Sequence, residues 1–108
     1  MKREVIATPL FKKNLQAYLD SYVELGAVRF VERIWLAYRK MIETISVFED
    51  IGIVRRRNIK GKAVTFREYV LAVEPRDFLI LYRIPPEADQ PLILLNIRIG
   101  GQNRFKWK

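Results

Sequence analysis

The chemistry available to this 108-residue chain is restricted, because its sequence contains no cysteine and no histidine. Without them it cannot form a disulfide, a Ser-His or Cys-His nucleophile pair, or a zinc site of the common kinds. Proton transfer would have to use Lys, Tyr, Asp or Glu, with Arg offsetting developing negative charge. Nothing in the sequence gathers ligands for a metal or an organic cofactor. We therefore expect neither, and no small-molecule ligand.

Side chains that could bind an anion are concentrated in the second half of the chain. The 20 basic and 12 acidic residues give a net charge of +8. Residues 1–53 hold 8 basic and 7 acidic side chains, whereas residues 54–108 hold 12 and 5. Two basic stretches account for this difference. The first comprises Arg55, Arg56, Arg57, Lys60, Lys62 and Arg67, and the second comprises Arg98, Arg104, Lys106 and Lys108.

The first stretch has two interpretations. Residues 55–62 are either a solvated loop connecting helices to strands, as charge runs usually are, or a basic surface that lies against RNA or an acidic protein partner. Attraction of the second kind would weaken with salt. Arg67 either holds a phosphate or is structural, pairing with Glu68, Glu74 or a helix C-terminus.

The C-terminal tail places aromatic residues between its cations. Phe105 and Trp107 alternate with the basic side chains, so they could stack on bases while the cations follow phosphates. The simpler alternative, which we favour, is that both rings pack against the helices and hold the tail there.

Trp35 has the helical phase of a core residue, and we predict that it is buried.

Two helices are expected before the basic half. Residues 4–7 predict a short strand, after which Thr8 and Pro9 offer an N-cap and a first helical position. Apolar residues then recur every three or four positions, and Gly26 is placed to end the first helix. A second amphipathic helix follows almost at once, through Ile45. The short link implies an antiparallel helical hairpin.

The second half predicts three strands in a meander, at residues 69–73, 78–84 and 92–99. In the last strand the alternation places Ile93, Leu95, Ile97 and Ile99 on the face that packs on the helices, and Asn96 and Arg98 on the other. The predicted class is α+β: a short strand and a two-helix antiparallel hairpin packed on a C-terminal antiparallel sheet, in the order β-α-α-β-β-β.

We expect residues 1–108 to be one domain, since no linker or repeat divides them. No apolar run approaches the roughly 20 residues needed to span a bilayer, and the N-terminus lacks the apolar stretch of a signal peptide. We therefore expect no membrane partner and a cytoplasmic location.

Several of these segments resemble a known family. An Arg67-Glu68 pair leads into Tyr69-Val70-Leu71. The segments Leu79-Ile80-Leu81-Tyr82-Arg83-Ile84 and Leu94-Leu95-Asn96-Ile97-Arg98-Ile99 follow, the last before a basic tail. Together with the element order, these segments resemble the RelE/ParE superfamily of bacterial toxins. The resemblance covers nearly the whole chain in element order.

The resemblance implies a type II toxin silenced by an acidic, partly disordered antitoxin. Members of the RelE kind cut mRNA on the ribosome, and those of the ParE kind poison DNA gyrase. A RelE-like mechanism would use Lys60 or Lys62, Arg67 and Arg104, but the tail has no tyrosine, which that kind uses. We therefore favour ParE-like inhibition by binding, with the nuclease as the alternative. A basic nucleic-acid-binding module without toxicity is the third hypothesis. The predicted target-binding residues are Arg55, Arg56, Arg57, Arg98, Lys106, Trp107 and Lys108.

Overall fold

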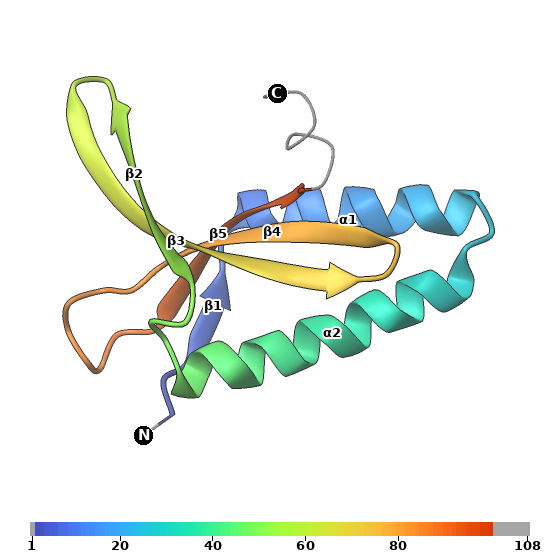
Figure 1. Cartoon of the computed structure of the whole chain (residues 1–108), viewed down its shortest axis with the longest axis horizontal. Coiled ribbons are helices and arrows are strands. Elements are labelled where there is room, and N and C mark those ends of the chain that lie inside the picture. Colours follow the sequence, from blue (N-terminus) through green and yellow to red (C-terminus); the bar gives the residue numbers. More distant parts are fainter. Residues whose placement is uncertain (1, 101–108) are drawn as a thin grey trace.

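The computed structural model describes residues 2–100. The tail residues proposed above as functional, Arg104, Lys106, Trp107 and Lys108, therefore lie outside the described residues. Both helices cover one face of a five-stranded sheet (Figure 1), so the predicted α+β class with a helical hairpin is confirmed. The elements are β1 (Val5–Ala7), α1 (Pro9–Glu24), α2 (Val28–Val47), β2 (Ile53–Ile59), β3 (Lys62–Val73), β4 (Arg76–Arg83) and β5 (Leu92–Ile99).

Helix α1 begins and ends where its sequence signals predict. The Thr8 hydroxyl accepts a hydrogen bond from the Phe11 N–H at 3.2 Å, and Pro9 takes the first helical position. Gly26 follows the helix with φ = 76°, a conformation that favours glycine. The Thr8 hydroxyl also donates to the carbonyl of Leu95 at 3.2 Å, which ties the start of α1 to β5.

The sheet has more strands than the sequence predicts. Its order is β1-β5-β4-β3-β2, and the four strands from β2 to β5 form a continuous antiparallel meander. The prediction of three strands there is wrong, because β2 is exposed along its whole length and has no alternation of apolar and polar residues. The sheet is also not wholly antiparallel: β1 pairs with β5 in parallel, with Val5 opposite Leu92.

A β-bulge in β5 changes which of its residues face the core. Tyr82 lies opposite Leu94, but Leu81 lies opposite Asn96, so Leu95 is an extra residue between them. Leu92 and Leu94 are buried before the bulge, and Ile97 is buried after it. The predicted shared face of Ile93, Leu95, Ile97 and Ile99 is therefore wrong for the first two, because the extra residue exchanges the two faces.

One core joins the helices to the sheet. Its buried apolar residues are Phe11, Leu15, Leu19, Ile34, Met41, Ile45, Leu71, Val73, Phe78, Ile80, Tyr82, Leu92, Leu94 and Ile97. Trp35 is not among them: it is 40% exposed, with its ring edge-on to Tyr38 at 5.8 Å between centroids. The prediction that Trp35 is buried is wrong, because it lies at the border of the apolar face of α2. Within residues 2–100, neither helix has the length and apolar character to cross a membrane.

Candidate target-binding surface

The first basic stretch forms a two-stranded arm. β2 pairs with β3 along its whole length, whereas β4 joins β3 only from Arg67 onward. Residues 55–66, which we call the arm, therefore pair only with each other and project beyond the rest of the sheet (Figure 1). The interpretation of residues 55–62 as a connecting loop is wrong, because they belong to β2, to the turn that follows it and to the first position of β3.

A tight turn closes the tip of the arm. Lys60 and Gly61 connect Ile59 to its partner Lys62, with φ values of 51° and 80°. Two central residues with positive φ are typical of the type I′ turn that suits the twist of a hairpin. Gly61 adopts this conformation without the steric cost that a Cβ imposes.

The arm carries five cations and no acidic residue. Every residue of β2 is exposed, as are Lys60 and Lys62. Among the described residues, carboxylates form ion pairs with Arg55 but not with the other four cations of the arm. These four are Arg56, Arg57, Lys60 and Lys62. The arm is therefore a surface of largely unneutralised positive charge.

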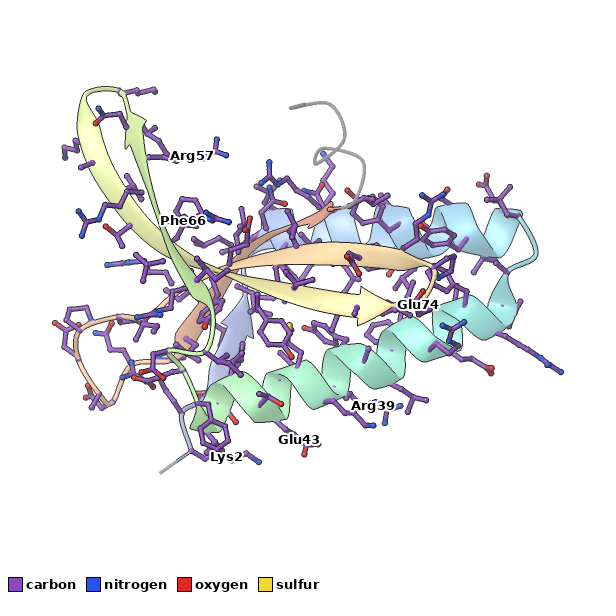
Figure 2. The ribbon with its side chains drawn as sticks, viewed as in Figure 1. Lys2, Arg39, Glu43, Arg57, Phe66 and Glu74 are labelled. Atoms are coloured by element: carbon purple, nitrogen blue, oxygen red, sulfur yellow. The ribbon has the colours of Figure 1, made fainter. Side chains whose placement is uncertain are left out.

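A groove of about 500 Å³ lies at the base of the arm, on the sheet face opposite the helices. Cross-strand register places Val70 opposite Leu79, and Leu79 opposite Arg98. Arg57 and Phe66 project from the same side of the arm (Figure 2). The groove thus combines an apolar floor with cationic walls. Its lining includes Ile53, Phe66, Val70 and Leu79 together with Arg55, Arg57 and Arg98.

One carboxylate serves two of these arginines. Glu68 Oε1 accepts from Arg55 Nη2 at 3.0 Å and from Arg55 Nε at 3.2 Å. Arg98 Nη2 lies 4.0 Å from Glu68 Oε2. Arg98 Nε is buried and has no hydrogen-bond partner among the described residues. The groove therefore keeps positive charge that an anionic partner group could pair with.

Within residues 2–100, the structure does not bring Lys60 or Lys62 close to Arg67. Lys60 and Lys62 lie at the arm tip, and Lys62 is five residues from Arg67 along β3, or roughly 17 Å at ~3.3 Å per residue. Strand alternation also places Lys62 and Arg67 on opposite faces of the sheet. Arg67 Nη1 donates to the carbonyls of Asp50 and Gly52, at 2.9 and 2.8 Å. Arg67 thus binds the segment that follows α2.

The sheet fixes the segment that leads from α2 into the arm. The Tyr82 hydroxyl donates to the Glu49 carbonyl at 2.7 Å and accepts from the Gly52 N–H at 2.9 Å. Burial raises the pKa of this hydroxyl above its ordinary value of 10.0, and the hydrogen bond from Gly52 opposes that rise. Arg3 holds the other side of the segment through an ion pair with Glu49 at 2.9 Å. These contacts set where the arm leaves the core.

The comparison with protein families decides the family. The model of the ParE toxin of the type II toxin-antitoxin system, parDE, matches residues 5–104. This chain belongs to the ParE toxin family. The search of curated proteins found no match. Membership in this toxin family confirms the resemblance drawn from the sequence, and it implies an antitoxin partner and a cellular target.

Sequence reasoning missed two parts of this surface. The sequence does not predict a role for Phe66, because the face on which its ring lies follows from the pairing of β2 with β3. The groove forms where residues of β3, β4 and β5 lie side by side, and the sequence of one strand does not reveal which residues of the next strand lie opposite it. The signal that could have found the arm is the Lys60-Gly61 pair between residues 53–59 and 62–73, since a glycine in a two-residue link is typical of hairpins.

Proposed function

We propose that this ParE-family toxin arrests growth by binding DNA gyrase through the groove at the base of the arm. We further propose that an acidic antitoxin neutralises it by covering the same surface. Gyrase is the target that the resemblance to the ParE kind implies, and the family match supports that kind. Binding by a preformed surface requires no proton transfer and so suits a chain without histidine.

One observation carries the choice of binding over RNA cleavage. The lysines that could exchange a proton lie at the arm tip, and Lys62 is on the opposite sheet face from Arg67. The donors of Arg67 that the structure records are directed at carbonyls. General acid–base catalysis requires its groups within hydrogen-bond reach of the reacting atoms. A groove with an apolar floor and arginine walls instead resembles a protein interface, where aromatic residues and arginines contribute most.

The charge of the groove supports an acidic antitoxin. Glu68 is shared between Arg55 and Arg98, and Arg57 has no carboxylate partner among the described residues. A carboxylate of the antitoxin would therefore add ion pairs without displacing an existing one. Apolar antitoxin residues would pack on Phe66 and Leu79. A disordered acidic segment that orders on binding has this composition.

The test begins with induced expression in bacterial cells. We expect growth to stop and gyrase-dependent DNA breaks to accumulate, while mRNA in a translating extract stays intact. Codon-phased cuts in the message would contradict gyrase binding and support the nuclease. Unimpaired growth, with the protein abundant in the cell extract, would contradict both toxin hypotheses and leave the non-toxic binding module.

A charge-reversal pair tests the assigned surface in the same cells. Arg57→Glu places a negative charge on the wall of the groove and should abolish growth arrest. Arg39→Glu makes the same change on the outward side of α2 (Figure 2) and should leave it intact. Both positions are exposed, so neither change should disturb folding. Equal loss of toxicity in both variants would show that overall charge, and not the groove, matters.

A further inference from the structure

The arm has a second face besides the one that forms most of the groove. Because neighbouring residues of a strand point to opposite faces, Arg56 and Asn58 lie on the face opposite to that of Arg55 and Arg57, and Arg56 also borders the groove. The pairing of β2 with β3 places Thr65 beside Arg56, and Ala63 beside Asn58. On this back face, the small side chains of Thr65 and Ala63 therefore lie beside the polar side chains of Arg56 and Asn58.

An open hollow of about 760 Å³ lies on the back of the arm, between the arm and the end of β4. Ala63 and Thr65 line it from the arm, and Arg83 and Ile84 line it from the end of β4. Arg83 is exposed. The cations of its lining are Arg67 and Arg83, and Lys60 and Lys62 lie farther out, at the tip of the arm.

The dimensions of the arm match the major groove of DNA. That groove is about 12 Å wide and admits a two-stranded β-ribbon. Paired strands lie ~4.8 Å apart, and residues 55–60 span roughly 20 Å at ~3.3 Å each. The deep, narrow major groove of A-form RNA does not admit side chains in this way. Shape therefore favours duplex DNA over duplex RNA.

The residue types fit the same partner. Arginine and asparagine are the side chains that pair with guanine and adenine edges in the major groove, and Arg56 and Asn58 lie two residues apart on the back face. Lysines at the tip supply point charges for phosphates. No carboxylate of the described chain pairs with Arg56, Lys60 or Lys62.

We propose that the arm binds duplex DNA, with its Arg56, Asn58 and Thr65 face in the major groove and Lys60 and Lys62 on the phosphates. The inference stands on the geometry of the arm and does not require gyrase. It also deepens the proposed function: a toxin held on gyrase by its groove would reach the DNA segment that the enzyme holds by its arm.

The test is equilibrium binding of the full chain to a fluorescent 20-base-pair DNA duplex, measured by anisotropy over a series of KCl concentrations. The arm variant Arg56→Ala/Lys60→Ala/Lys62→Ala is compared with Arg29→Ala/Arg39→Ala/Lys40→Ala on α2. Each removes three exposed cations, so net charge changes equally. Each phosphate contact contributes ~0.9 to the salt slope. We expect the arm variant to lose about 10- to 100-fold in affinity and about two units of slope.

Specific outcomes would overturn the proposal. Equal losses in the two triple variants would assign binding to overall charge, and unchanged binding by the arm variant would assign it elsewhere. An RNA duplex of the same sequence that binds as tightly as DNA would exclude the major groove. Protection of guanine N7 from dimethyl sulfate provides a second readout: bound wild-type chain should protect it, and absence of protection also excludes that groove.

The assay separates this inference from the proposed function, because it contains no gyrase and no living cells. Loss of DNA binding in the arm variant together with normal growth arrest would support the proposal that the arm binds DNA. It would also show that toxicity does not depend on DNA binding by the arm. Absence of DNA binding by the wild-type chain, with toxicity retained, would overturn the arm proposal alone. Superimposable circular dichroism spectra of the variants confirm that both are folded.

Discussion

The Tyr82 hydroxyl accepts a hydrogen bond from the Gly52 N–H at 2.9 Å, across 30 residues of sequence. It also donates to the carbonyl of Glu49. Tyr82 is fully buried in β4, and Gly52 immediately precedes β2. This contact joins the core of the sheet to the root of the arm. The position of the candidate target-binding surface therefore depends on a residue that is not part of that surface.

Replacing Tyr82 with phenylalanine should destabilise the fold. The change keeps the ring but leaves the buried N–H of Gly52 without its acceptor, and an unsatisfied buried polar group costs about 1–3 kcal/mol. Urea unfolding should show a lower midpoint at an unchanged slope. The matched control is Tyr69→Phe on β3, because Tyr69 is half-buried and makes none of these hydrogen bonds. Equal stability of Tyr82→Phe and the wild type would contradict the contact.

Stability should fall at alkaline pH, and Tyr82 should contribute to that fall. Burial raises the pKa of its hydroxyl in the folded state above 10.0. The unfolded chain then releases the proton first, so the contribution is complete below about pH 10 and is lost as pH rises through the folded-state pKa. Burial also raises the pKa of Tyr38, so Tyr82→Phe should make the fall shallower without removing it. Identical pH profiles would contradict the prediction.

A methyl group at Gly52 should not fit. A Cβ there would lie 2.7 Å from the Tyr82 hydroxyl oxygen and 2.8 Å from its ring. Gly52→Ala should therefore cost about 1–3 kcal/mol of unfolding free energy, as overpacking does. The double variant Gly52→Ala/Tyr82→Phe should recover little, since the ring contact remains. Thermal unfolding of the set measures this, and a neutral Gly52→Ala would show that the segment can move away.

Arg67 should contribute mainly to the stability of the fold, and only indirectly to toxicity. Its guanidinium binds the carbonyls of Asp50 and Gly52, and hydrogen bonds to charged groups contribute about 1.5–3 kcal/mol. Arg67→Ala should lower the urea midpoint, and growth arrest should weaken only as far as the folded fraction falls. A variant of native stability that has lost toxicity would instead assign Arg67 to target binding.

Local signals predicted the helices well because each acts within a few residues. Thr8 accepts from the N–H three residues on, and Gly26 adopts a conformation that glycine favours. Neither depends on the rest of the fold. The class, the helical hairpin and strand β5 followed from such signals together with periodicity.

The arm and the bulge were missed because each depends on pairing across strands. Three consecutive arginines hide the alternation of β2, and one extra residue at Leu95 exchanges the faces of β5 without any mark in the sequence. The cationic residues of the groove were predicted individually. Their meeting with Phe66 and Leu79 arises from sheet register, which the composition of a segment does not encode.

The central claim is that the groove binds the toxin's target, and inhibition of DNA supercoiling by purified gyrase tests it most directly. The wild-type chain and Arg39→Glu should inhibit supercoiling at the same concentration. Arg57→Glu should need at least about tenfold more protein, because its reversed charge opposes binding. Inhibition by Arg57→Glu at the wild-type concentration, or no inhibition by the wild-type chain, would contradict the claim.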